Sequence, residues 1–305
     1  TVPERLSSAE ELNASEHGFA GQAKKLPASG GDPDAADQAI ITKLEEAIAG
    51  GVGMTHLAVA DAHTGQPIWQ YQDEPASPMS LIKTLTAMYV LETLGPEYHF
   101  ETFVKLSENG DEVQLTLIGN GDSLLSNKQV EELAQETAAA LRELGDGSAG
   151  VTVTVDDSAF AGPALFPEWS PELVSSGNIA PLRPATMYGG REQPGTGTER
   201  TGRDPNLILA ERFRAALMDA LPDSGDITVR PLPSELVVET DAKAQEVAAV
   251  ESVKVSTQVK NALQHSDNQV TETLMRGALV AQGREASNET VVAELTEYVR
   301  GFVPE

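Results

Sequence analysis

The stretch from Pro78 to Leu94 reads PMSLIKTLTAMYVLETL and is the most apolar helix-like run of the chain. Pro78 opens it and a Gly-Pro pair follows it, and these are common signals for the start and the end of a helix. Within it, Lys83 follows Ser80 by three residues, a spacing that no other serine and lysine of the chain share. Positions i and i+3 lie on one helix face, so the Lys83 amine can approach the Ser80 hydroxyl. The pair predicts a serine acyl-transfer site at a helix start.

Two physical effects favour Ser80 as a nucleophile. The unpaired N–H groups and the partial positive charge of a helix start stabilise an alkoxide or an oxyanion beside it. The apolar neighbours of Lys83 are expected to desolvate its amine and lower its pKa, which would let it act as a neutral general base near pH 7. The alternative is a buried helix with a capping serine and a snorkelling lysine.

The wider segment, residues 78–100, resembles the nucleophile helix of the penicillin-recognising serine enzymes. Upstream, residues 57–69 alternate around a turn that holds Thr64-Gly65, a pattern that predicts a hairpin. It is similar to the strand-turn-strand unit that precedes the nucleophile in that family. The likeness is greatest to the class C low-molecular-mass penicillin-binding proteins, the D-alanyl-D-alanine carboxypeptidase/endopeptidases. The resemblance implies Ser80 as nucleophile and Lys83 as its base.

A second motif of that family reads Ser266-Asp267-Asn268 and precedes an apolar helical stretch. The resemblance implies that Ser266 passes a proton to the leaving group and that Asn268 binds the backbone amide of the substrate. The alternative is a plain helix cap, because serine, aspartate and asparagine all favour the N-cap position.

The spacing of the two motifs indicates the domain organisation. Ser80 and Ser266 are 186 residues apart, too far for the compact β-lactamase arrangement. The resemblance therefore implies an inserted domain at 103–249 and a split penicillin-binding domain at 37–102 and 250–305. Residues 1–36 are rich in Ala, Ser, Glu, Gly and Pro with little periodicity, which predicts a linker or flexible arm. The insert is expected to be rich in strands, at 112–118, 151–155, 227–229 and 236–238, with helices at 127–144 and 207–221.

Two further features of the insert bear on the site. Trp169 matches a position that in relatives overhangs the active-site mouth, which implies contact with the substrate; a partly buried structural tryptophan is the alternative. The loop from Gly189 to Pro205 is rich in Gly, Pro and Thr and is expected to be mobile.

The third motif of the family, Lys-Thr-Gly, is not found where the resemblance places it, well downstream of Asn268. His63-Thr64-Gly65 and Arg200-Thr201-Gly202 imitate it, but both precede Ser266 and are interpreted as turns. The chain is therefore expected to be a truncated, cleaved or naturally short form. Lack of the motif should cost most of the activity, because each oxyanion-hole donor is worth about 3–4 kcal/mol.

Composition narrows the remaining function classes. The chain has 305 residues, no cysteine and a formal net charge of −26, which argues against nucleic acid and anionic membranes as partners. No apolar run is long enough to span a membrane. The five histidines show no metal-ligand spacing, and neither a metal nor a cofactor is expected. The composition fits a secreted protein, and we expect an exported, extracellular or cell-envelope protein. Because the sequence begins at Thr1 without a charged-then-apolar leader, its signal peptide is expected to have been removed.

These observations predict a penicillin-recognising α+β domain split by a strand-rich insert. A mainly antiparallel sheet is expected around the buried Ser80 helix. The implied function is a serine-type D-alanyl-D-alanine carboxypeptidase/endopeptidase that acts on peptidoglycan stem peptides and binds β-lactams. The alternatives are a catalytically inactive relative that binds peptidoglycan or a partner protein, favoured by the missing third motif, and a β-lactamase-like hydrolase, disfavoured by the insert.

Overall fold

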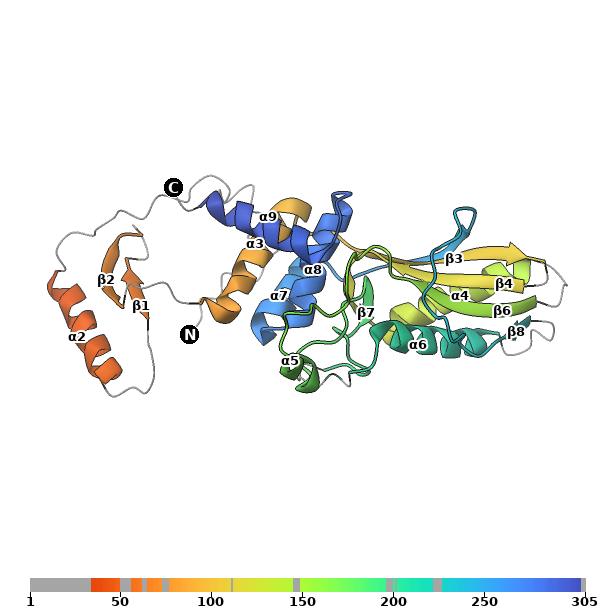
Figure 1. The fold of residues 1–305 in the computed structure, drawn as a ribbon, viewed down its shortest axis with the longest axis horizontal. Coiled ribbons are helices and arrows are strands. Elements are labelled where there is room, and N and C mark those ends of the chain that lie inside the picture. The colour runs from red at the N-terminus through yellow and green to blue at the C-terminus, as the bar shows by residue number, and fades with distance from the viewer. Residues whose placement is uncertain are drawn as a thin grey trace.

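The computed structural model describes residues 34–49, 56–61, 65–72, 77–110, 112–144, 149–195, 200, 202–221 and 227–302. The arm predicted at 1–36 lies almost wholly outside this part of the chain. Figure 1 shows an elongated molecule with a helical part in the middle and a strand-rich part on one side. Each of these two parts has its own buried apolar cluster.

A five-stranded sheet, in the order β8-β6-β4-β3-β9, forms the strand-rich part. Strands β4, β6 and β8 run parallel, and β3 runs antiparallel to both of its neighbours. The strands are β3 (Glu101–Asn109), β4 (Glu112–Gly119), β6 (Ala149–Asp156), β8 (Ile227–Val229) and β9 (Gln245–Glu251). The strands predicted at 112–118, 151–155 and 227–229 are confirmed, whereas 236–238 forms only an isolated bridge to β6.

Two helices, α4 (Asn127–Glu143) and α6 (Pro205–Ala220), pack on each other and on this sheet. Helix α4 begins at a capping box in which Ser126 accepts from the Gln129 N–H and the Gln129 side chain accepts from the Ser126 N–H. Alternation in β4 sends Val113, Leu115 and Leu117 to one face, where they join the buried cluster with residues of both helices. Both helices agree with the periodicity of the sequence.

The helical part carries both sequence motifs. Its elements are the 3₁₀ turn η2 (Met79–Leu81) and the helices α3 (Ile82–Leu94), α7 (Val255–His265), α8 (Asn268–Ala281) and α9 (Asn288–Arg300). Helix α3 packs on α7, α8 and α9, and the buried cluster includes Val90, Phe100, Val255 and Leu279. The nucleophile helix therefore lies among helices.

This arrangement corrects one prediction. The sequence predicted a mainly antiparallel sheet with the Ser80 helix buried at its centre, but in the described residues the large sheet is mixed and spans 101–251. Ser80 lies at the exposed start of its helix, between Met79 (76% exposed) and Leu81 (71% exposed). Helix α3 packs instead against the apolar faces of α7 and α8.

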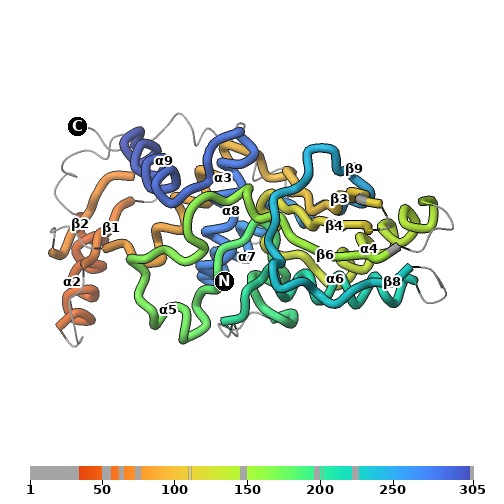
Figure 2. The backbone as a smooth tube through the Cα atoms, turned by 45° about the vertical axis from the view of Figure 1, so that its right-hand side comes forward, coloured from red at the N-terminus to blue at the C-terminus, as the bar shows by residue number. Residues whose placement is uncertain are grey.

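Two adjacent strands connect the parts. The chain leaves the helical part along β3 and returns along β9, which pair antiparallel and lie side by side in Figure 2. Where they meet the helices, the Ser252 N–H donates to the Phe100 carbonyl at 2.8 Å, and the Phe100 N–H donates to Ser252 Oγ at 3.0 Å. This junction brings α3 and α8 together although their residues are far apart in the sequence.

A second contact between the parts depends on glycine. A small parallel pair, β5 (Asp122–Leu125) and β7 (Ala185–Met187), lies against α8. Gly121 has a φ of +136° and approaches Gly277 of α8 beside the Phe100 ring, so closely that a Cβ on Gly277 would lie 2.6 Å from the ring. Only glycine allows this approach.

The N-terminal elements lie at one end of the molecule in Figure 1. They are α2 (Ala35–Ala49) and the antiparallel strands β1 (Leu57–Ala60) and β2 (Pro67–Tyr71), which confirm the predicted hairpin. Part of its turn, residues 62–64, lies outside the described residues. The domain boundaries inferred from the motif spacing stay a prediction.

Candidate active site

Ser80 and Lys83 lie on the turn that leads into α3. The Lys83 Nζ donates a hydrogen bond to Ser80 Oγ at 3.1 Å, as the i, i+3 spacing predicted. Neither η2 nor α3 has a side-chain cap, so Ser80 is not the capping serine of the alternative interpretation. Ser80 is an exposed residue, which leaves it accessible to a ligand.

The Lys83 side chain is buried although Ser80 is exposed. Lys83 is only 7% exposed and lies on the packed face of α3. Burial lowers the pKa of its amine below the usual 10.5, against the opposing effect of the carboxylates of Asp267 and Glu272. A lowered pKa raises the fraction of neutral amine near pH 7, which a general base requires.

Ser266 meets Ser80 from the other side of the site. It ends α7 in the left-handed conformation, with φ 50° and ψ 39°, and its hydroxyl donates to Ser80 Oγ at 2.9 Å. The N-cap of α8 is Asp267, whose carboxylate accepts from the Val270 N–H at 3.1 Å. The helix-cap alternative therefore holds for Asp267 and leaves the Ser266 hydroxyl to the site.

Within the described residues, the two other predicted site residues form no hydrogen bond with Ser80, Lys83 or Ser266. Asn268 is half-buried at the first position of α8, and its side chain forms no hydrogen bond within the described residues. Trp169 packs edge-on against Phe166, with ring centroids 6.3 Å apart, and lines an apolar cavity of about 460 Å³ formed by residues 165–175. Neither Ser80 nor Ser266 lines that cavity, so the roles of Asn268 and Trp169 stay predictions.

Sequence reasoning missed two arginines. Arg191 and Arg200 come from the loop at 189–205 and both bind the carboxylate of Asp267, at 2.8 and 2.6 Å. Arg200 was interpreted as part of a surface turn, yet its side chain is only 2% exposed. No local pattern marks these residues, because the ion pairs join positions 67 and 76 residues apart. Residues 196–199 and 201 of this loop lie outside the described residues, so its mobility stays a prediction.

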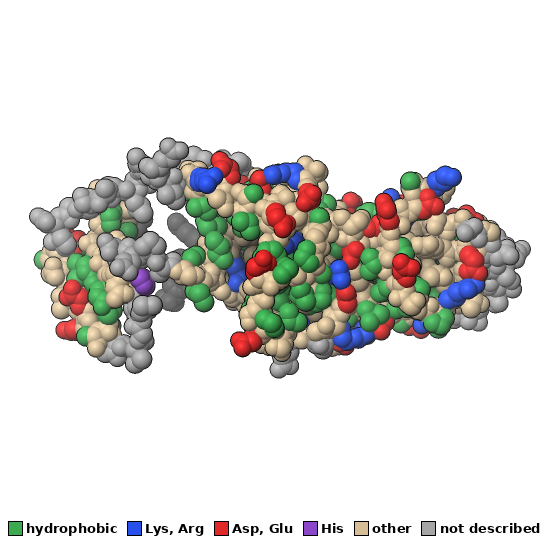
Figure 3. Space-filling model, in the orientation of Figure 1, with side chains coloured by type: hydrophobic (Ala, Val, Ile, Leu, Met, Phe, Trp, Pro, Cys, Tyr) green, Lys and Arg blue, Asp and Glu red, His purple; other side chains and the backbone are tan. Residues whose placement is uncertain are grey.

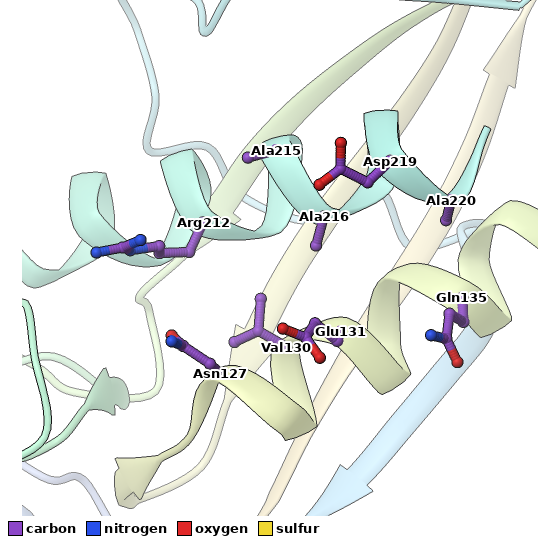
Figure 4. A pocket seen from close by; sticks show the side chains of 9 residues that line it. All are labelled: Asn127, Val130, Glu131, Gln135, Arg212, Ala215, Ala216, Asp219 and Ala220. Atoms are coloured by element: carbon purple, nitrogen blue, oxygen red, sulfur yellow. The ribbon is translucent and has the colours of Figure 1, made fainter. Parts of the chain in front are cut away.

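Outside this cluster, the described residues form a groove between two helices and carry a strongly acidic surface. A groove of about 370 Å³ lies between α4 and α6, and Figure 4 shows its alanines, Arg212 and the carboxylates of Glu131 and Asp219. In Figure 3, acidic side chains are spread over the visible face, as the net charge leads one to expect. Within the described ranges, no group of three or more histidines or carboxylates could hold a metal ion.

Comparison of the sequence with known protein families points to the same kind of site as the contacts among Ser80, Lys83 and Ser266. The D-Ala-D-Ala carboxypeptidase 3 (S13) family matches residues 40–225 of the chain. The chain belongs to this family. That membership confirms the family resemblance, and the matched residues include 78–100 but not the Ser266-Asp267-Asn268 motif.

Known relatives support the same family and fold. The chain is 32% identical over 245 residues to a carboxypeptidase from Mycobacterium tuberculosis, which covers 78% of this chain and 51% of the relative. It is 29% identical over 276 residues to a carboxypeptidase from Mycolicibacterium smegmatis, with coverages of 88% and 58%. The chain thus spans roughly half of these relatives' length.

The fold is similar to that of penicillin binding protein 4 from Haemophilus influenzae. The TM-score is 0.60 at 15% identity, over 80% of this chain and 66% of that protein. The predicted penicillin-recognising α+β fold is therefore confirmed.

Among the described residues, none of the helices combines the length and the apolar character that a membrane span needs.

Proposed function

We propose that this chain carries the acyl-transfer site of a serine-type D-alanyl-D-alanine carboxypeptidase/endopeptidase. One observation carries the proposal: the exposed Ser80 hydroxyl lies within hydrogen-bonding distance of both the buried Lys83 amine and the Ser266 hydroxyl. A nucleophile beside a base, with a third group in contact, is the arrangement that activates a serine. Family membership supports this chemistry.

In the proposed reaction, Ser80 Oγ attacks the carbonyl carbon of the penultimate D-alanine. Its proton passes to the neutral Lys83 amine, and the Ser80 N–H supplies one donor to the oxyanion. As the peptide bond breaks, Ser266 relays this proton to the amine of the leaving D-alanine. Water then hydrolyses the ester, and Ser80 regains its proton. Asn268 orients the peptide backbone, and Trp169 contacts a substrate side chain.

The substrate and location follow from this chemistry. We propose that the protein acts on peptidoglycan stem peptides, is acylated by β-lactams, and works outside the cell or in its envelope. The structure of Haemophilus influenzae penicillin binding protein 4 has also been described in complex with a β-lactam, which supports β-lactam binding. The two separate buried clusters support a split catalytic domain at 37–102 and 250–305 around an insert at 103–249.

The experiment measures release of D-alanine from a peptide that ends in D-Ala-D-Ala. The full-length protein should release D-alanine, and Ser80→Ala should abolish the release. Ser77→Ala is a matched control, because Ser77 is exposed in the same segment but bonds only within its own turn. Equal release by wild type and Ser80→Ala would refute the assignment. No release with tight peptidoglycan binding would favour the inactive relative.

A further inference from the structure

The position of the Ser266 hydroxyl depends on an unusual backbone conformation. Ser266 is a non-glycine residue in the left-handed region, where side chains other than those of Asn, Asp and Gly are disfavoured. Such a conformation persists where the surroundings hold it. The Ser266 N–H donates to the Ala262 carbonyl, and the Asp267 N–H donates to the same carbonyl at 2.9 Å, so the position of Ser266 also depends on how Asp267 is held.

The next residue, Asp267, is held more firmly than a helix cap requires. Its carboxylate Oδ1 caps α8 and also accepts from Arg200, and its Oδ2 accepts from Arg191. The three side chains are 2%, 2% and 9% exposed. Burial by itself raises the pKa of Asp267, but the two arginines and the Val270 N–H outweigh it, so the pKa lies below 3.8. Asp267 therefore stays ionised near neutral pH.

Arg200 is fixed on its other side as well. Its guanidinium donates to three backbone carbonyls, those of Gly189 at 2.7 Å and of Gly177 and Asn178 at 3.1 Å each. Arg191 donates to the Tyr188 carbonyl at 2.9 Å. Both arginines thus tie the Ser-Asp-Asn loop to segments at 177–191, which belong to the predicted insert.

The charges around Lys83 add a second consequence. Lys83 is faced by the carboxylates of Asp267 and Glu272 from α8, and both raise its pKa. Arg191 and Arg200 offset the charge of Asp267, and Glu272 pairs with Arg276. Removing either arginine would leave Asp267 less compensated, and its pull on the Lys83 proton would grow.

We propose that Arg191 and Arg200 are positioning residues of the acyl-transfer site. They hold Asp267 in place, and through it they keep the Ser266 hydroxyl in contact with Ser80. They also compensate the negative charge of Asp267 beside Lys83. The insert therefore helps to build the site. This inference rests on the proposed function.

The test measures acylation of the full-length protein by a fluorescent penicillin in stopped flow. Arg200→Met and Arg191→Met are compared with the wild type. Each is also made in a protein that carries Ser266→Ala and compared with Ser266→Ala alone. Arg203→Met is the matched control, because Arg203 pairs with Glu192 and Glu211 at the surface without contacting Asp267. Circular dichroism checks the fold, and Arg191→Met takes the place of Arg200→Met if the latter does not fold.

We expect Arg200→Met to slow the acylation step by about tenfold or more with little change in the binding step. In the Ser266→Ala background the same change should slow acylation much less, because the two residues act through one contact. The pH profile of acylation should move to higher pH, and Arg200→Lys should restore part of the rate.

Two results would overturn the inference alone. One is a folded Arg200→Met, or Arg191→Met where Arg200→Met does not fold, that acylates at the wild-type rate. The other is a loss that adds fully to that of Ser266→Ala with an unchanged pH profile. A wild-type protein that is not acylated would instead overturn the proposed function and this inference with it.

Discussion

Asp122 gives the sharpest prediction for stability. It lies on β5, is completely buried, and accepts one hydrogen bond from the Leu124 N–H at 2.9 Å. Its Oδ2 has no partner within the described residues. Burial raises the pKa of Asp122 from 3.8 to about 7, although the Leu124 N–H opposes this. The carboxyl is therefore about half protonated at neutral pH.

The sign of the effect on stability follows from linkage. The folded state binds this proton more tightly than the unfolded state, so stability falls as the pH rises from about 4 to about 7 and then levels off. The full cost of ionising the buried group is about 4 kcal/mol, and about 3 kcal/mol of it appears between pH 5 and pH 8. The neutral amide of Asp122→Asn has no such cost.

The assay is urea unfolding at pH 5 and pH 8. Between these two pH values the wild type should lose about 3 kcal/mol more of its unfolding free energy than Asp122→Asn does. Asp241→Asn, at an exposed position, is the control and should follow the wild type. An identical pH dependence in wild type and Asp122→Asn would refute the reasoning.

Two further predictions concern the site and the contact between the two parts. Lys83→Ala should fold and yet slow acylation by about 10² to 10⁴-fold. In a pH series of penicillin labelling, the wild-type rate should rise with pH through a Lys83 pKa below 10.5. A Lys83→Ala variant that is acylated at the wild-type rate would exclude Lys83 as the base. Gly277→Ala should destabilise the fold by about 1–3 kcal/mol, because its Cβ would lie 2.6 Å from the Phe100 ring. Gly195→Ala is the control and should not destabilise the fold, because no atom lies within 4 Å of its added Cβ. Equal melting temperatures of the two variants in thermal unfolding would contradict the packing argument.

Local patterns in the sequence predicted much of this molecule. The spacing of Ser80 and Lys83 fixes a helix face, and the structure shows the expected contact. Periodicity likewise predicted α4 and α6, because a buried helix face needs apolar residues at regular intervals. The family resemblance implied that Ser80 and Ser266 act on one substrate, and the structure places their hydroxyl oxygens 2.9 Å apart.

Contacts between distant residues were not predictable in this way. The ion pairs of Asp267 with Arg191 and Arg200 depend on how a loop folds back on α8, which no spacing rule encodes. The predicted position of the large sheet relative to the Ser80 helix was wrong for a related reason. Strand patterns show which residues face a core, but the partner of α3 is decided by tertiary packing.

Mapping a penicillin adduct on the full-length protein tests the central claim most directly. After reaction with excess penicillin and proteolysis, mass spectrometry should find one acyl group, on the peptide that contains Ser80, and none in Ser80→Ala. Lys83→Ala should carry far less adduct after the same short reaction. An adduct on another serine, or no adduct on a folded wild-type protein, would contradict the assignment of Ser80 as the nucleophile.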